Sequence, residues 1–181
     1  MNARVSPADK GQQFRAVVLP HLADALAFAR WLTGSSIDAE DVVQEACIRA
    51  LGGIDTYAGG SSRAWLLAIV RNTCFTWLAK HRPKSLVLAG NAAEAAEMGD
   101  AALNEAEPTP EAQLIAKADT EAVGAAITAL PSPFREVVVL RDINGLSYRE
   151  IASTIGVPIG TVMSRLARAR CQLAIELGRM R

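Results

Sequence analysis

Apolar residues recur along this chain at spacings of three and four, which is the period of an amphipathic α-helix. Between Phe14 and Leu32 that spacing is interrupted only near Pro20, because proline lacks an N–H and breaks a helix interior. No stretch alternates well enough to predict a strand. The pattern therefore predicts an all-α fold. Its further helices are expected over residues 38–51, 64–80, 112–130, 133–141, 148–155 and from about 159 onward.

The helix after Ile37 has two distinct faces. Asp38 can serve as its N-cap, with Asp41 three positions on, close to a capping box. We expect its inward stripe to consist of Val43, Cys47, Ala50 and Leu51. A second stripe, at i, i+3, i+4 and i+7, consists of Asp41, Gln44, Glu45 and Ile48. Solvent exposure explains such a polar stripe, although Ile48 among these groups also hints at a contact face.

A turn-rich segment, residues 52–63, precedes the helix expected over 64–80. The polar side of that helix includes Arg71, Asn72, Thr76 and Lys80. A basic helix end beside a Gly/Ser loop can bind phosphates. Basic side chains at a helix C-terminus also satisfy the helix dipole, so this feature alone is a weak indication of nucleic-acid binding.

The most specific pattern lies near the C-terminal end of the sequence. Ser147-Tyr148-Arg149-Glu150 is an S-x-x-E capping box that opens a short helix, which Gly156 ends. A short helix, a glycine turn and a longer basic helix are typical of a DNA-binding helix-turn-helix. The core stripe of the last helix is Val162, Leu166, Ala169 and Leu173. Its opposite face carries side chains that can bind phosphates or base edges, namely Thr161, Ser164, Arg165 and Arg168.

Charge divides the chain into three parts, although its 19 basic and 19 acidic residues give zero formal net charge. Residues 1–85 carry +3, residues 86–113 carry −6 and residues 114–181 carry +3. The acidic part is rich in Ala with Gly and Pro, so it offers little to bury and favours a linker over a solvated acidic helix. We therefore expect two small helical domains, 10–84 and 111–181, joined by an acidic flexible linker, 85–110.

Several function classes are disfavoured. Cys47, Cys74 and Cys171 lie far apart within helical patterns, and we interpret them as small buried hydrophobes. With His21 and His81 they offer no metal-ligand spacing, and no catalytic triad or phosphate loop occurs. We expect no enzyme activity, no metal and no cofactor. No window approaches the roughly 18 apolar residues of a membrane-spanning helix, and no secretory signal is evident, so we expect a cytoplasmic protein without membrane insertion.

Five segments together carry a family resemblance. Residues 130–138 (LPSPFREVV), 145–152 (GLSYREIA) and 156–170 (GVPIGTVMSRLARAR) closely resemble the C-terminal promoter-binding domain of extracytoplasmic-function (ECF) sigma factors. Residues 38–46 (DAEDVVQEA) resemble that family's polymerase-clamp helix, and residues 64–73 (AWLLAIVRNT) resemble its helix for the −10 promoter element. The resemblance implies a bacterial transcription initiation factor of the sigma-70 family without catalytic activity of its own.

The resemblance also implies which residues meet which partner. Core RNA polymerase would be bound by Asp41, Gln44, Glu45 and Ile48. The −10 element would be contacted by the loop before the third helix and by that helix, through Tyr57, Arg63, Arg71, Asn72 and Lys80. The −35 element would be contacted chiefly by the last helix, through Thr161, Ser164, Arg165 and Arg168, with Ser147 and Arg149 placed to reach the DNA backbone.

Three departures from the family pattern bear on promoter preference rather than on class. Thr76 stands where an acid is usual, the Arg-rich run that normally follows is thinned to Ala79-Lys80-His81-Arg82, and Met163 stands where Lys is common. Because family members are commonly held inactive by an anti-sigma protein, the expected partners are core RNA polymerase, promoter DNA and an anti-sigma factor, in a stress response.

A stand-alone helix-turn-helix regulator is the alternative interpretation. Such proteins normally bind palindromic sites as dimers, and this chain shows no obvious dimerisation heptad. That alternative also leaves the whole N-terminal part unexplained. Because acidic segments oppose phosphate contacts, we expect residues 112–181 alone to bind promoter DNA better than the whole chain does.

Overall fold

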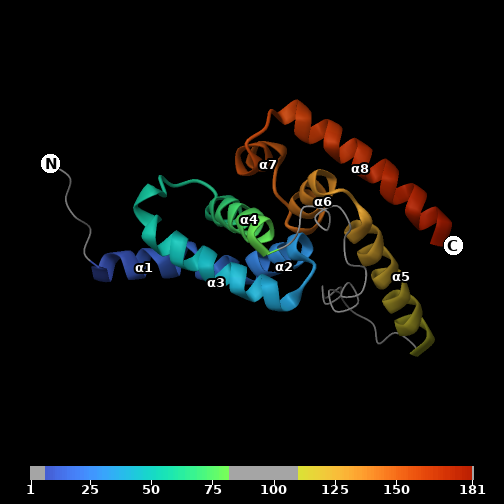
Figure 1. Ribbon diagram of the computed structural model, residues 1–181, viewed down its shortest axis with the longest axis horizontal. Helices are drawn as coiled ribbons and strands as arrows, with labels where there is room; N and C mark the ends of the chain where they lie inside the picture. The colour runs from blue at the N-terminus through green and yellow to red at the C-terminus, as the bar shows by residue number, and fades with distance from the viewer. Residues whose placement is uncertain (1–6, 82–109, 181) are drawn as a thin grey trace.

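The computed structural model describes residues 7–81 and 110–180, and in these ranges the chain forms helices and no strands (Figure 1). The expected all-α fold is thereby confirmed. We call the N-terminal helices the first lobe: α1 (Pro7–Val17), α2 (Leu22–Thr33), α3 (Ser36–Gly52) and α4 (Ser62–His81). We call the C-terminal helices the second lobe: α5 (Pro110–Ala129), α6 (Ser132–Val138), α7 (Tyr148–Ile155) and α8 (Ile159–Met180).

The first lobe begins with two helices separated where the sequence predicts. Pro20 lies in the 3-10 turn η1 (Leu19–His21) between α1 and α2, so the expected break is confirmed. Gly34 ends α2 with φ 68°, in the left-handed region that favours glycine. The core of this lobe is formed by large side chains that are completely buried, among them Phe28, Ile54, Leu66 and Leu67.

One expectation for α3 is wrong and another is only partly right. Its N-cap is Ser35, whose hydroxyl accepts a hydrogen bond from the N–H of Asp38 (3.2 Å), so Asp38 lies in the first turn instead. Its inward stripe is Ala39, Val42, Ala46 and Ala50, which confirms Ala50. Val43 and Cys47 are only partly buried against the core, and Leu51 is 45% exposed. The expectation gave too much weight to larger apolar residues. Here the small alanines face inward and allow α3 to pack closely against α2 and α4.

The second lobe contains the expected helix-turn-helix. The Ser147 hydroxyl accepts from the N–H of Glu150 (3.2 Å), and the Glu150 carboxylate accepts from the N–H of Ser147 (2.8 Å), which confirms the capping box. Gly156 has φ 69° and ends α7. On α8 the expected core residues Val162, Leu166 and Ala169 are buried, and Leu173 is partly buried. The helix-turn-helix therefore has one packed face and one open face.

The preceding helix differs from expectation in two details. α6 begins at Ser132 rather than at Pro133, with Pro131 in the N-cap position and no side chain capping the helix. The helical run then continues as a short π-helical segment, η4 (Val139–Ile143), before the turn at Asn144-Gly145.

The two lobes pack against each other directly. α2 contacts α6, and α4 contacts α7. The buried apolar side chains of both lobes form one continuous cluster, and in Figure 1 α7 lies beside α4 and α6 lies beside α2. The acidic linker expected over residues 85–110 lies almost entirely outside the described residues. The division into domains 10–84 and 111–181 stays a prediction.

Candidate functional site

The outer face of α3 carries the four residues expected to bind polymerase. Asp41 and Gln44 are exposed, and Ile48 is 67% exposed. Glu45 forms an ion pair with Arg49 at 2.8 Å, one helical turn away. The structure therefore brings all four onto one accessible face, on which Ile48 lies beside acidic and amide groups.

Two further apolar residues extend that face, and the sequence analysis did not identify them as site residues. Ile37 is 76% exposed and Leu51 is 45% exposed. With a helical period of 3.6 residues, both align with Ile48. The α3 stripe is the name used below for Ile37, Asp41, Gln44, Glu45, Ile48 and Leu51. The helical period would have identified both residues if the alanines of α3 had been predicted to face inward.

The loop before α4 has a fixed shape. The Tyr57 hydroxyl donates to the carbonyl oxygen of Gly60 (2.7 Å), and the Tyr57 ring lies 5.5 Å from the Trp65 ring, tilted by 57°. Gly59 and Gly60 have φ of 92° and 89°. Because side chains other than glycine are strained there, two glycines are required to turn the chain over the aromatic pair.

The start of α4 is held by polar contacts with α2 and η1. Arg63 forms an ion pair with Asp24 at 2.7 Å. His21 and Ser62 share a hydrogen bond of 2.8 Å. Arg63 is therefore only partly exposed, and part of its charge is already neutralised within the protein.

Arg71 lies on the side of α4 that faces the second lobe. Its Nε donates to Oε1 of Glu136, and its Nη2 lies 3.5 Å from Oε2 of the same carboxylate. Glu136 belongs to α6, and its side chain is only 2% exposed. Burial raises the pKa of Glu136, while the hydrogen bond and charge of Arg71 oppose that rise. Arg71 is thus engaged in an ion pair between the lobes.

The C-terminal half of α4 is more accessible. Asn72 and Lys80 are both exposed, as a nucleic-acid contact requires. Thr76 donates from its hydroxyl to the carbonyl oxygen of Asn72 (2.9 Å), so it satisfies the helix backbone. The Trp77 and His81 rings stack with centroids 4.0 Å apart, one helical turn from each other. This stack is a further candidate contact that the sequence analysis missed, although aromatics four residues apart beside Lys80 signal it.

The open face of the helix-turn-helix presents the residues expected to meet the −35 element. Arg149, Ser164 and Arg168 are exposed, and Thr161 and Arg165 are partly exposed. The Ser164 hydroxyl donates to the carbonyl oxygen of Thr161 (3.0 Å). These side chains lie together on α7 and the N-terminal half of α8. Ser147 is also exposed, but its hydroxyl is used by the capping box described above.

Two apolar side chains flank this polar face. Ile159 is 40% exposed and Met163 is 53% exposed, four residues apart on the first turns of α8. In the major groove the apolar feature that a base offers is the thymine methyl group. The sequence analysis noted Met163 only as a departure from the family pattern, at a position where Lys is common.

The three cysteines differ in environment. Burial raises the pKa of the Cys74 thiol to about 12, and burial also raises the pKa of Cys47. Cys74 is buried, Cys47 is only partly buried and Cys171 is exposed, so the expectation that all three are buried is confirmed for Cys74 alone. Within residues 7–81 and 110–180, no group of three His, Cys, Asp or Glu side chains is placed to hold a metal ion. No described helix is both long enough and apolar enough to cross a membrane.

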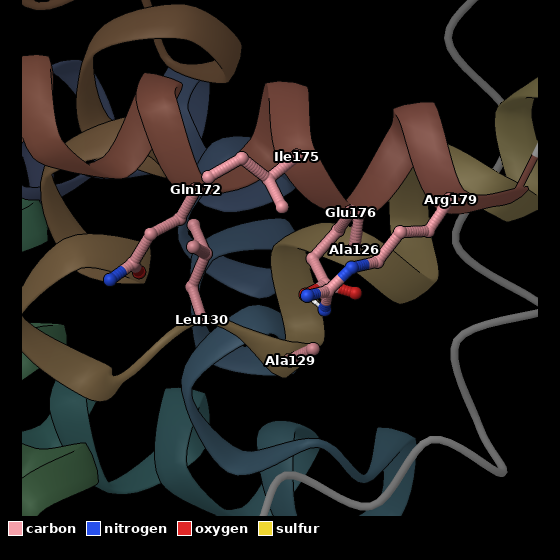
Figure 2. A pocket seen from close by; sticks show the side chains of 7 residues that line it. All are labelled: Ala126, Ala129, Leu130, Gln172, Ile175, Glu176 and Arg179. Carbon is pink, nitrogen blue, oxygen red and sulfur yellow. Dashed lines mark hydrogen bonds and ion pairs between the residues drawn. The ribbon is translucent and has the colours of Figure 1, made fainter.

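A shallow groove lies apart from these surfaces, between α5 and α8 (Figure 2). Its volume is about 250 Å³. Glu176 and Arg179 are paired at 3.0 Å on its α8 side. Its lining is mostly aliphatic: Ala126, Ala129, Leu130, Gln172, Ile175, Glu176 and Arg179. The groove holds no cluster of catalytic side chains, and we assign it no role.

Known proteins resemble this chain in both sequence and fold. Family models match residues 17–83 (sigma-70 region 2) and 120–173 (sigma-70, region 4). The ECF RNA polymerase sigma-E factor of Escherichia coli K12 is 39% identical over 136 residues, covering 74% of this chain and 70% of that protein. The ECF RNA polymerase sigma factor SigE of Mycolicibacterium smegmatis is 36% identical over 158 residues, covering 87% of this chain and 58% of that protein.

Solved structures show the same arrangement of helices. The sigma factor RpoE in complex with the anti-sigma factor NepR from Bartonella quintana matches with a TM-score of 0.68 and 28% identity, covering 94% of this chain and 99% of that one. CnrH in complex with the cytosolic domain of CnrY matches with a TM-score of 0.61 at 23% identity, which supports the fold alone. With two region models in the expected order and a relative 39% identical, the chain belongs to the ECF subfamily of sigma-70 RNA polymerase sigma factors.

Proposed function

We propose that this sigma factor binds core RNA polymerase through the α3 stripe and contacts promoter DNA through α4 and through the α7–α8 helix-turn-helix. The observation that carries the proposal is the separation of two accessible surfaces, one on each lobe. An acidic and apolar face on α3 suits a protein partner, and the arginine-bearing face of α8 suits a duplex. A stand-alone regulator would need only the second surface.

The α3 stripe fits a protein interface in composition. Ile37, Ile48 and Leu51 expose apolar surface that a partner can remove from water, which is the main source of affinity at interface centres. Asp41 and Gln44 lie between these apolar residues. They can make binding specific, and a negative charge there can steer the encounter with a basic partner. We therefore assign polymerase binding to Asp41, Gln44, Glu45 and Ile48, together with Ile37 and Leu51.

The −10 element is assigned to the loop before α4 and to the accessible side of α4. Aromatic rings bind unpaired bases by stacking, at about 1–3 kcal/mol per base, and basic side chains follow the phosphates. Tyr57 and the Trp77–His81 stack provide the rings. Arg63, Arg71, Asn72 and Lys80 provide the polar and basic groups, of which Arg63 and Arg71 must first leave their partners within the protein.

The −35 element is assigned to the open face of α8. An α-helix enters the major groove of B-form DNA, and arginine can bind guanine through two hydrogen bonds or neutralise a phosphate. The exposure of Arg168 and the partial exposure of Arg165, with Thr161 and Ser164 beside them, support this assignment. Arg149 on α7 lies beside this face of α8, where it can contact the DNA backbone.

An anti-sigma partner and a cellular location complete the proposal. The RpoE structure that matches this chain holds an anti-sigma factor. We expect a partner of that class here and a role in a stress response. Because its own partners are RNA polymerase and the chromosome, we place the protein in the bacterial cytoplasm. We assign it no catalytic step, cofactor or metal, since binding alone accounts for the activity of a sigma factor.

Association with core polymerase tests this function against the alternative. In gel filtration, the purified chain should run as a monomer alone and co-elute with bacterial core enzyme when the two are mixed. A protein that runs as a dimer, ignores the core enzyme and binds palindromic duplexes by itself would instead be a stand-alone regulator.

A further inference from the structure

The ion pair between the lobes contains a buried charge. Glu136 on α6 is almost completely shielded from water, and its carboxylate is bound by Arg71 on α4, 65 residues earlier in the chain. A buried charge without a partner costs several kcal/mol, so Glu136 requires a cation in this arrangement. Arg71 supplies it, and Arg165 adds a more distant positive charge.

The neighbouring residue on α6 makes a second contact across the lobes. Arg135 is only 8% exposed. Its Nη1 donates to the carbonyl oxygen of Trp31 in α2 (3.2 Å). Its Nη2 donates to carbonyl oxygens of its own lobe, at Leu130 (3.0 Å) and Thr128. Two adjacent side chains of α6 therefore hold α4 and α2 of the first lobe.

A third contact joins the loop before α4 to the start of α7. A hydrogen bond from Ser61 helps to lower the pKa of Glu150, after the larger effect of Ser147. Nη1 of Arg63 lies 4.0 Å from the position that a Cβ atom on Gly145 would take. Ser61 and Arg63 flank the start of α4, so the second lobe covers part of the proposed −10 surface. We call this packing of α6 and α7 on α2 and α4 the closed arrangement.

The closed arrangement is incompatible with simultaneous binding of both promoter elements. Elements centred at −10 and −35 are about 25 base pairs apart, or roughly 85 Å along B-form DNA at 3.4 Å per base pair. α4 and α7 are in direct contact here. The 28 residues from 82 to 109 that connect the lobes can reach roughly 95 Å when fully extended. The connection is therefore long enough for the lobes to separate on a promoter.

We propose that Glu136 competes with DNA phosphate for Arg71, so that the free sigma factor is held closed and binds promoters weakly until polymerase separates its lobes. The proposal rests on the proposed function. The carboxylate occupies the guanidinium as a phosphate would, since arginine binds both groups through the same fork of donors. The α3 stripe stays exposed in the closed arrangement, so polymerase can bind before the lobes open.

The contact is suited to a reversible switch. An intact buried ion pair contributes little net stability, because the cost of removing both charges from water offsets their attraction, whereas removing one partner leaves the other charge uncompensated and destabilises the packed form. Opening returns Glu136 to water and frees Arg71 for the −10 strand. A population shift requires that polymerase and promoter bind the open form more tightly than the closed one. The closed arrangement therefore also lowers the affinity of the free protein for DNA, in addition to the repulsion by the acidic segment.

The test compares Glu136→Gln with a matched control, Asp142→Asn. Asp142 is exposed and pairs with Arg170 at 2.7 Å within the second lobe, so its substitution makes the same change in net charge and leaves the pair of Arg71 and Glu136 intact. Separation of the lobes is read by energy transfer between dyes on Gln12→Cys, an exposed site on α1, and on the exposed Cys171, in a Cys47→Ser background. Cys74 remains unlabelled because it is buried.

Energy transfer should be high in the free wild-type protein and should fall when core polymerase is added. The Glu136→Gln variant should show lower energy transfer than wild type even without polymerase. It should also bind a promoter duplex at least ten-fold more tightly than wild type does, with the promoter identified beforehand by run-off transcription. Asp142→Asn should match wild type in both measurements. The proposal is wrong if free wild-type protein already gives the low transfer of the polymerase complex, or if Glu136→Gln binds DNA no better than Asp142→Asn.

The wild-type measurement keeps the proposal testable even if Glu136→Gln fails to fold. The same samples separate this proposal from the proposed function. Wild-type protein that supports no promoter-directed transcription with core enzyme would overturn the function. Energy transfer in the free protein would still report whether its lobes are closed.

Discussion

At the scale of single residues, the assignments depend on side chains that the fold leaves exposed at some cost. Ile37 and Ile48 on α3, and Ile159 and Met163 on α8, are large apolar groups that contribute nothing to the core. Exposed apolar groups on the same face of a helix as charged site residues indicate a contact surface. Each pair therefore leads to a specific substitution.

Ile48→Lys should weaken binding to core polymerase by about ten-fold or more, which corresponds to about 1.4 kcal/mol. It removes an apolar contact and places a positive charge among the acids of the α3 stripe. Titration of labelled protein with core enzyme measures the effect, with Val123→Lys on α5, an exposed valine outside every assigned surface, as control. Equal affinities for the two variants would remove Ile48 from the polymerase interface.

Met163 should make binding of the −35 duplex sensitive to a thymine methyl group. Replacing the thymines of that duplex by uracil, one at a time, removes only the methyl group. At one position the replacement should lower the affinity of the protein for the duplex about four-fold, as expected for about 0.8 kcal/mol per buried methyl. The Met163→Ala variant should lose that sensitivity. If uracil substitution affects both proteins equally at every position, Met163 does not contact a base.

At the scale of elements, the helix-turn-helix depends on two local devices, the capping box of α7 and the left-handed glycine that ends it. Both were predicted from the sequence, because S-x-x-E and a following Gly are local signals that do not depend on packing. The inward face of α3 was predicted only in part, since which stripe is buried depends on how closely α2 and α4 approach. Alanines allow that close approach, and no local pattern reveals it.

Gly156→Ala should destabilise the folded protein by about 1–2 kcal/mol, because a Cβ is strained at φ 69°. A Cβ there would meet no atom within 4 Å, so the cost comes from the backbone alone. Gly160→Ala, in the first turn of α8 and also with open space around it, should instead be neutral or stabilising. Urea unfolding compares them, and equal effects would contradict the backbone argument.

Glu150→Gln should remove part of the acid sensitivity of folding. Hydrogen bonds from Ser147, followed by Ser61, lower the pKa of Glu150 below its usual value. A carboxyl with a lowered pKa in the folded state stabilises that state above its unfolded pKa, and the contribution disappears as the pH falls through the folded pKa. Wild type should therefore be more stable than the variant at pH 7, and the difference should shrink near pH 3. A difference that stays constant across this range would rule out the carboxylate as its source.

At the scale of the whole molecule, the sequence predicted two helical lobes and the surfaces assigned to each. It did not predict their packing. Arg71 was expected to be free for DNA, whereas the structure pairs it with Glu136 of the other lobe. Contacts between residues 65 positions apart have no local signature, and Glu136 looks like any acid on an amphipathic helix. The candidate site residues could thus be named from the sequence, but the ion pair that engages one of them, Arg71, could not.

In vitro run-off transcription on genomic DNA tests the central claim most directly, since it requires polymerase binding and promoter recognition together. Core RNA polymerase supplemented with the wild-type chain should produce a small set of defined transcripts that share sequence near −10 and −35. The Ile48→Lys variant should produce them only at higher protein concentration. Transcripts identical with and without the protein, under conditions where a known sigma factor activates the same core enzyme, would contradict the account.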